Sequence, residues 1–278
     1  MFLLLPAVLL SGGCLPEEPP EVATQPAPES FAEVRILGDP DGATTRPADK
    51  RYVLIVRLRI ASIEVPLGTA SGTERLWSYL NEEAFSSART AGLGRNGFRA
   101  GTAKGDAWED LARVFKEMTG RKLREQNINT LPGRPTHMFL KEAEPLRTIF
   151  LSHADRTLSG EDFPPGDYLL GLSVTLNEDD PSRLLVTGWP VIRSTHRETR
   201  FVRRNGQPVM VTEPLYFPLA PLQFQAQMDS GDLLVIGPGA ASRRPTSAGR
   251  RFLVKRKEGM DFETVLVIVP EVFATPMR

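Results

Sequence analysis

Residues 168–176 read YLLGLSVTL, a stretch in which large apolar side chains recur at every second position. Those positions are Tyr168, Leu170, Leu172, Val174 and Leu176. Successive side chains of a β-strand point to opposite faces of its sheet, so this spacing predicts a strand with one buried face. We therefore expect a core that depends on period-two burial and is shared with other strands of the second half.

The segments that follow carry related signals. Apolar residues alternate with glutamines in Leu222–Met228, and short apolar runs occupy Leu233–Ile236 and Thr264–Val269. Asn205-Gly206 lies between two β-branched stretches and is a strong signal for a tight hairpin turn. Together these patterns predict mainly antiparallel sheets in the second half of the chain.

The first half combines a strand with helices. Tyr52–Ile60 is apolar and β-branched, which is typical of a strand. Helices are predicted near 72–84, where Ser71 and Glu74 have capping-box spacing, and near 106–119, where apolar residues fall on one helical face. The expected fold class is therefore α+β and β-rich, with mainly antiparallel sheets and two amphipathic helices in the first half.

Composition limits the classes of function. The chain of 278 residues is long enough to bury a substantial core without covalent staples. Basic and acidic residues balance at 34 each, so no strong overall field attracts nucleic acid. Cys14 is the one cysteine, which excludes a disulfide framework within the chain and a cysteine-rich zinc site.

The amino terminus has the features of an export signal. Phe2–Leu10 reads FLLLPAVLL, which is too short to span a bilayer but suits the apolar core of a signal peptide. Small residues and then Cys14 follow, and this resembles the cleavage box of bacterial lipoproteins, in which the cysteine is acylated. We predict a signal peptide at 1–14 with lipidation of Cys14. The alternative is a plain cleaved signal with an incidental cysteine.

The next segment differs from the rest of the chain in composition. Residues 15–48 are rich in proline and glutamate and lack the apolar content that folding requires, which predicts a disordered tether. A β-rich domain is expected at 49–278. Leu15 follows the cysteine where inner-membrane lipoproteins of enteric bacteria carry aspartate. The expected location is therefore the bacterial cell envelope, at the outer membrane and facing the periplasm.

Motifs with chemical meaning are weak in this sequence. Residues 92–97 match G-x-G-x-x-G, but they follow a predicted helix and precede a strand, which indicates a turn that needs positive φ rather than a dinucleotide site. His137, His153 and His196 are scattered and lack metal-ligand spacing. No nucleophile elbow or phosphate-binding loop is present in the sequence. We therefore predict no catalytic residue, no metal and no cofactor.

Two groups of polar residues are candidates for an interaction surface. Gln223, Gln225 and Gln227 should line one face of a strand, either as a solvated face or as an edge that pairs with another subunit. Arg250 and Arg251 belong to a series of basic pairs that suits a solvated face or an anionic partner.

The order of these segments resembles the secretin domain of bacterial type II and type III secretion systems and pilus machines, in a divergent and shortened form. The segments that carry the resemblance are Tyr52–Ile60, Leu111–Met118, Asn129–Pro135, Gly171–Leu176, Leu184–Thr187, Ser230–Gly237 and Glu263–Pro270. Ala240–Gly249 departs from the family pattern. The resemblance implies a β-rich fold and ring-like association.

These expectations combine into one leading interpretation. The protein should be a non-catalytic envelope lipoprotein that acts as a structural or assembly component. Its partners would be the membrane, through the lipid, and other envelope proteins or further copies of itself, without nucleic acid. The alternatives are a periplasm-facing ligand-binding module and an envelope hydrolase.

Overall fold

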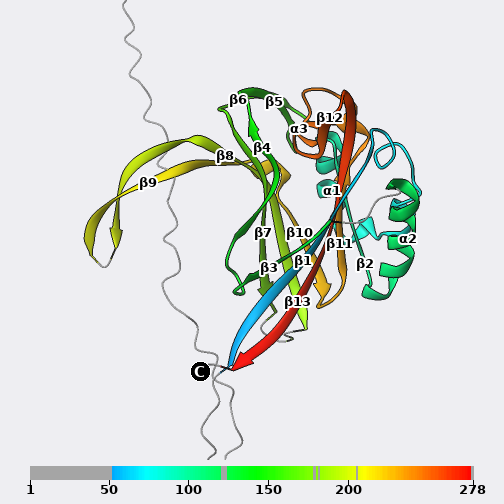
Figure 1. The fold of residues 1–278 in the computed structure, drawn as a ribbon, viewed down its shortest axis with the longest axis horizontal. Coiled ribbons are helices and arrows are strands. Elements are labelled where there is room, and N and C mark those ends of the chain that lie inside the picture. Colours follow the sequence, from blue (N-terminus) through cyan, green and yellow to red (C-terminus); the bar gives the residue numbers. More distant parts are fainter. Residues whose placement is uncertain (1–51, 120–123, 178–179, 181, 205, 277–278) are drawn as a thin grey trace, which may run out of the picture. The chain divides into compact units, whose positions relative to one another are not determined.

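The computed structural model describes residues 52–276, apart from 120–123, 178–179, 181 and 205. Figure 1 shows the described part as two stacked β-sheets with helices on one outer side. The predicted signal peptide, Cys14 and the proline-rich tether lie outside the described residues. The β-rich, antiparallel character expected from the sequence is confirmed.

One sheet, sheet A, runs through the middle of the molecule. Its strands lie in the order β2-β11-β13-β1-β3, with β12 also paired to β13, and every pairing is antiparallel. The strands are β1 (Tyr52–Pro66), β2 (Phe98–Ala103), β3 (Arg124–Thr130), β11 (Leu233–Pro238), β12 (Val254–Lys257) and β13 (Met260–Pro276). The first and last strands of the chain are therefore neighbours along their whole length.

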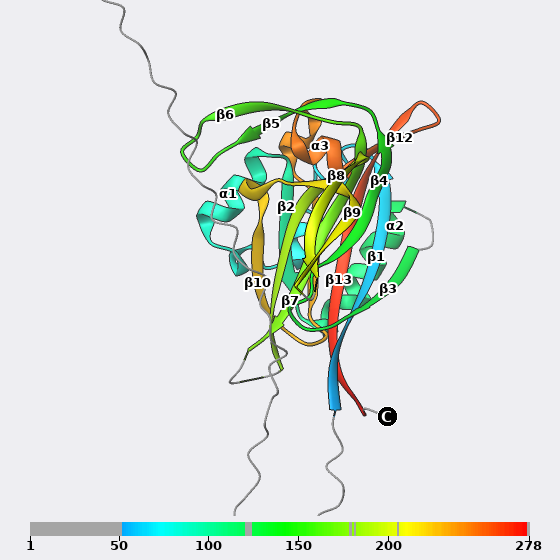
Figure 2. The same cartoon turned by 90° about the vertical axis from the view of Figure 1, so that its left-hand side faces the viewer.

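Sheet A is covered on both faces, which explains its continuous apolar runs. Leu266 and Ile268 of β13 join the core between the sheets, whereas Val265 and Val267 pack on the opposite face against helix α2 (Trp108–Thr119). A strand buried on both sides cannot show strict alternation. Figure 2 shows the same layers from the side.

The second sheet, sheet B, packs on the other side of that core. Its order is β10-β8-β7-β4, with β9 paired to β8. The strands are β4 (Thr136–Glu144), β7 (Gly166–Leu176), β8 (Arg183–Arg204), β9 (Gln207–Pro218) and β10 (Phe224–Asp229). A separate two-stranded ribbon consists of β5 (Arg147–Ser152) and β6 (Leu158–Phe163).

Period-two burial connects the two sheets. Leu170 and Val174 of β7, together with Phe224 of β10, lie in the same core cluster as Leu234 of β11 and Ile268 of β13. The shared interior predicted from the sequence is thus present, but it lies between two sheets. Of the four strands predicted around it, β7 and β10 belong to sheet B, and β11 and β13 belong to sheet A.

The predicted helix near 72–84 is wrong. The structure has a turn there, followed by the short 3-10 helices η1 (Trp77–Tyr79) and η2 (Glu82–Ala84). Glu74 and Glu82 both bind Arg99 of β2, and their carboxylates would lie about 12 Å apart along a helix. Because both contacts exist, the segment has to curl round the arginine instead of rising as a helix.

The remaining helices are few and short. Helix α1 (Ser87–Arg95) is capped by Ser86, α2 lies within the second predicted range, and α3 is Ala248–Leu253. Further 3-10 turns are η3 (Gly105–Ala107), η4 (Ala220–Leu222) and η5 (Ala240–Arg243). Within the described part of the chain, no helix combines the length and apolarity needed to cross a membrane.

Helix α3 sits unusually close to the end of α1. A Cβ atom on Gly249 would lie 2.0 Å from the backbone oxygen of Gly97, and the Gly249 N–H donates to the Asn96 oxygen at 2.7 Å. Gly97 has φ +84°, a conformation that suits glycine. Of the motif at 92–97 that was predicted to be a turn, only its last glycine, Gly97, has the expected positive φ, since Gly92 and Gly94 belong to α1.

Candidate functional site

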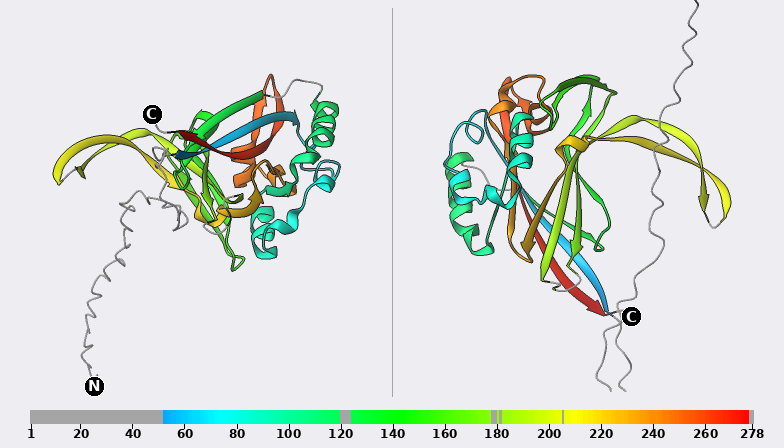
Figure 3. Two further views of the ribbon diagram at one scale, coloured as in Figure 1. Left: turned by 90° about the horizontal axis from the view of Figure 1, so that it is seen from below. Right: turned by 180° about the vertical axis from the view of Figure 1, so that it is seen from behind.

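A long ribbon extends from sheet B. The first part of β8 pairs with β7 up to Ser194, and beyond a register shift Arg197–Arg204 pairs only with β9 among the described strands. We call residues 195–214 the arm. Figures 1 and 3 show the arm projecting and curving away from both sheets. Gly206 near its tip has φ +78°, in keeping with the hairpin turn predicted there.

The arm exposes apolar side chains on one of its faces. Phe201 and Met210 are cross-strand partners, with 76% and 64% of their surface exposed. A pair of hydroxyls follows on the same face, where Thr199 and Thr212 lie 3.0 Å apart. Two apolar side chains thus stand side by side in solvent, on a ribbon with few other groups to cover them.

Both edges of the arm are open within the described part of the chain. Residues 197–204 of β8 pair only with β9, and β9 itself pairs only with β8. An isolated two-stranded hairpin is marginally stable in water, and unpaired edges are templates for another strand. The arm therefore has the properties of a segment that gains stability when a partner covers it.

An aromatic group lies where the arm leaves sheet B. His137 stacks on Tyr216 with ring centres 5.2 Å apart, and meets the edge of Trp189 at 6.4 Å. The Trp189 ring lies across Gly171, where a Cβ atom would come within 2.3 Å of it. Burial, followed by the charge of Arg193, lowers the pKa of His137. The exposed His137 ring thus lies against side chains of β8 and β9 at the place where the arm leaves sheet B.

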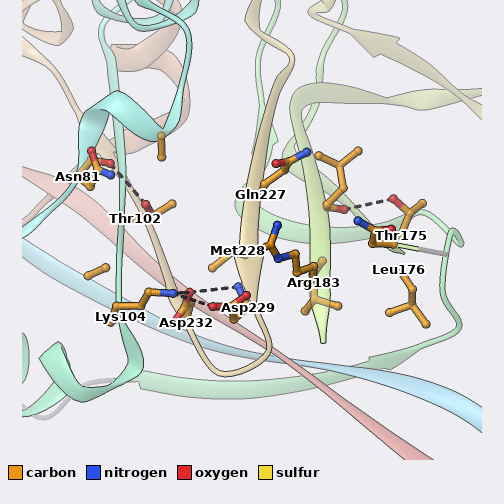
Figure 4. A pocket seen from close by; sticks show the side chains of 15 residues that line it. Asn81, Thr102, Lys104, Thr175, Leu176, Arg183, Gln227, Met228, Asp229 and Asp232 are labelled. Carbon is orange, nitrogen blue, oxygen red and sulfur yellow. Dashed lines mark hydrogen bonds and ion pairs between the residues drawn. The ribbon is translucent and has the colours of Figure 1, made fainter. Parts of the chain in front are cut away.

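A cleft of about 670 Å³ opens between β2 of sheet A and β10 with β8 of sheet B. Apolar residues such as Leu184 and Met228 form part of its wall. Figure 4 shows Gln227 and Arg183 near Met228. The volume falls within the range of small-molecule sites.

The charges at one end of this cleft satisfy one another. Lys104 binds Asp229 at 2.7 Å and Asp232 at 3.0 Å, as the dashed lines in Figure 4 show. The hydrogen bonds that Lys104 donates to Asp229, and then to Asp232, raise the pKa of Lys104. The group therefore stays charged at neutral pH and ties β2 to the turn after β10.

The residues predicted as an interaction surface divide between two places. Gln225 and Gln227 are exposed on β10, an edge strand of sheet B, while Gln223 lies just before that strand. Gln227 also lines the cleft. Arg250 and Arg251 lie on α3, which packs on β4, β5 and β11. The structure thus does not bring the glutamines and the arginines into one site.

The histidines and the glycine-rich motif also separate. Gly92 and Gly94 lie inside α1, and neither is near a strand end that would form a dinucleotide site. His153 contacts Ser159 at 2.6 Å on the β5–β6 ribbon, but Asp155 binds Thr157 instead of the histidine. Within the described residues no three metal-ligating side chains converge.

Sequence reasoning did not find the arm or the cleft. The hairpin turn at 205–206 was visible in the sequence, but the length over which the strands leave the sheet was not. The cleft arises where edges of two sheets approach each other. Such an approach has no local sequence signal, because its residues come from β2, β8 and β10.

Comparisons with known proteins give little further information. No protein-family model and no curated protein matches the sequence. Among solved structures, a chain in the cryo-EM structure of the ETEC pilotin–secretin AspS–GspD complex matches with 9% identity and a TM-score of 0.20. The match covers 81% of this chain and 49% of that chain, so this protein spans about half of it. At that TM-score the match does not establish a shared fold, and the resemblance to secretins stays a prediction.

Proposed function

We propose that this protein is a non-catalytic structural component of the bacterial cell envelope, anchored through lipid on Cys14, which associates with other protein chains through its arm. The observation that supports this most directly is the exposed pair of Phe201 and Met210 on a ribbon with two open edges. A second copy of the chain is the partner that we propose first, and another envelope protein is the next.

The energetic argument rests on burial. Covering a Phe or Met side chain contributes about 1.5–3 kcal/mol each, so the pair supplies enough free energy to affect association strongly. A strand that adds to an open edge also supplies backbone hydrogen bonds. The four arginines and two glutamates of the arm keep it soluble while it is uncovered.

The arm can be tested with the full chain carrying Cys14→Ser, which removes the predicted acylation site. We expect sedimentation equilibrium to show self-association that weakens at least about tenfold when Phe201→Ser and Met210→Ser are combined. The matched control is Leu158→Ser on β6, which removes a side chain of similar exposure, 64%, outside the arm. A chain that is strictly monomeric before substitution would count against self-association, and equal effects of the control and the arm variant would count against the arm.

The anchor has a separate test in cells. We expect the unaltered protein to remain in the membrane fraction after a carbonate wash and to incorporate radiolabelled palmitate. Cys14→Ser should release it to the soluble periplasmic fraction, because the acyl chains supply the membrane affinity. The arm variant should stay with the membrane. Retention of Cys14→Ser in the washed membranes would contradict the lipid anchor.

A second candidate function is binding of a small ligand in the cleft. The observation that favours it is a cavity of about 670 Å³ with apolar walls and polar side chains at its margin. The mutual pairing of Lys104 with Asp229 and Asp232 leaves fewer charged groups for a ligand, so we place this function second.

A further inference from the structure

The two edges of the arm differ in the backbone groups that they offer to another strand. Arg204 and Gln207 are partners with two residues between them, and the partners that flank such a turn exchange both of their backbone hydrogen bonds. Bonded and non-bonded partners alternate along an antiparallel pair. Even-numbered residues of β8 in the arm therefore bond to β9, and odd-numbered residues point their N–H and C=O groups outward. On β9 the odd-numbered residues bond to β8 and the even-numbered residues point outward.

Prolines in β9 support this assignment independently of the turn. Pro208 and Pro214 lie in the paired part of the arm but have no backbone N–H. A strand tolerates proline where its nitrogen faces away from the partner strand, which is the place that the turn gives to both residues. Beyond the arm, the Leu219 N–H donates to the backbone oxygen of Pro190 on β8 at 2.9 Å, as expected for an odd-numbered residue of β9.

The outer edge of β9 is therefore a poor template for another strand, whereas the outer edge of β8 is complete. Of the outward positions 208, 210, 212 and 214 on β9, the first and the last are proline, a residue that protects edge strands from pairing. The outward residues of β8 all have an N–H as well as a C=O, and all are exposed: Arg197, Thr199, Phe201 and Arg203.

We propose that the outer edge of β8 in the arm pairs antiparallel with the same edge of a second copy, around a two-fold axis at Phe201. This inference rests on the association proposed above and assigns the strand and the register through which it occurs. Two arms joined in this way form one ribbon in the order β9-β8-β8-β9. Both outer edges of that ribbon then carry the prolines of β9, so the assembly closes as a dimer instead of growing further. This closure is the reason why a second copy suits the edge.

The apolar side chains of the arm fit this register. Phe201 on the axis lies opposite its own copy, and Met210 is its partner on β9. The exposed apolar pair of each copy thus joins the other pair in one row across the ribbon, in the order Met210-Phe201-Phe201-Met210. Apolar side chains that lie directly opposite each other stabilise a sheet.

Two nearby registers are less favourable. An axis at Arg200 would oppose Arg200 to itself and Arg197 to Arg203, and like charges placed directly opposite each other are destabilising. An axis at Thr199 would place Phe201 opposite Arg197 and separate the two aromatic rings. The register centred on Phe201 therefore combines apolar contact with the absence of these arginine pairs.

The test compares two proline substitutions in the full chain carrying Cys14→Ser, by sedimentation equilibrium. Thr199→Pro removes an outward N–H of β8, and Thr212→Pro removes an outward N–H of β9. The two threonines are cross-strand partners whose hydroxyls lie 3.0 Å apart, so both variants lose the same contact within the arm. We expect Thr199→Pro to weaken self-association about 10- to 100-fold, because the two-fold axis removes two hydrogen bonds between the chains, and Thr212→Pro to leave it unchanged.

The outcomes separate this inference from the proposed function. Equal association of the two proline variants, together with weaker association of the Phe201→Ser and Met210→Ser chain, would overturn the pairing of β8 edges and leave association through the arm intact. A chain that is monomeric before any substitution would overturn both this pairing and self-association, and would leave another envelope protein as the partner of the arm.

Disulfide trapping reads the register without a proline. The Cys14→Ser chain has no other cysteine, and an axis at Phe201 places Arg200 of one copy opposite Val202 of the other. This is a non-bonded position, where opposite side chains come closest. A mixture of chains carrying Arg200→Cys and Val202→Cys should form a linked dimer faster than either variant alone. No excess of the mixed dimer over the two self-linked dimers would overturn the register.

Discussion

Replacing Glu263 with alanine is expected to destabilise the folded chain by about 3–5 kcal/mol. Glu263 lies on β13 and is fully buried, with 0% of its surface exposed. Its carboxylate accepts hydrogen bonds from the backbone N–H of Ala70 at 2.8 Å and of Ser71 at 3.0 Å, and also from the Ser71 hydroxyl. Alanine would leave these buried donors without acceptors.

The effect should extend beyond the turn itself. Ala70 and Trp77 belong to the apolar cluster between sheet A and α2, and the Trp77 ring N–H donates to the Ala70 oxygen at 2.9 Å. Loss of the carboxylate therefore loosens a turn that packs on the core. We expect Glu263→Gln to cost less than alanine, because its amide oxygen can accept both backbone N–H groups and its amide nitrogen can donate to the Ser71 hydroxyl.

Urea unfolding followed by circular dichroism measures this difference. The matched control is Glu271→Ala on the same strand, whose contacts to Arg57 and Arg59 at 4.0 and 3.8 Å are partly exposed. Such surface pairs contribute about 0–1 kcal/mol. A Glu263→Ala protein as stable as the Glu271→Ala protein would show that the carboxylate does not hold the turn.

Replacing Lys141 with methionine should have the opposite sign and stabilise the folded chain at pH 7. The pKa of Lys141 is lowered to about 8, chiefly by burial and then by the neighbouring cations Lys255, Arg251 and Arg250, with Glu144 opposing them. Against an unfolded value of about 10.4, the shift corresponds to a cost of up to about 3 kcal/mol for the charged lysine. Methionine fills a similar volume without that cost.

The burial cost of Lys141 also predicts how the stability of the folded chain changes with pH. Below pH 8 the lysine is protonated in both the folded and the unfolded chain, and the folded state carries the whole cost of burying the charge. Between about pH 8 and 10.4 the folded chain releases the proton while the unfolded chain keeps it, so stability rises with pH. The advantage of Lys141→Met should therefore be full at pH 7 and disappear toward pH 10.5.

Urea midpoints at pH 7 and at pH 10 for both chains test this expectation. Lys116→Met, on the exposed side of α2, is the control and should change stability little at either pH. A methionine variant that is less stable at pH 7 would mean that the lysine contributes packing or pairing that outweighs its burial.

Some features of the fold follow from residue order. The alternation in Tyr168–Leu176 predicted a buried face, and four of its five alternating residues are buried, with Leu176 partly covered. The alternation after Gln223 was equally informative, since Phe224, Ala226 and Met228 are buried and the glutamines between them are exposed. On β10 the local pattern and the environment agree because its glutamine face is solvated, whereas on β7 Leu169 of the opposite face is also fully buried.

Other features escaped the same reasoning for identifiable causes. The spacing of Ser71 and Glu74 indicated a helix start, but Ser71 binds Glu263 and Glu74 binds Arg99. These partners are far away in the sequence, and a buried carboxylate outweighs a weak helical preference. The arginines at 250–251 were expected on a surface; both are partly exposed, but the Nε of Arg251 is buried.

The sequence by itself determined the alternation of buried and exposed side chains on β10 and the hairpin turn at the tip of the arm. The tertiary structure decided which strands share a sheet, how far the arm leaves it, and which distant residues meet at α3 and at the turn of Ala70 and Ser71. The physical reason is the separation along the sequence over which each effect acts, because alternation and turn chemistry depend only on neighbouring residues. The contacts of Lys141 with α3 and of Glu263 with its turn join residues more than 100 positions apart.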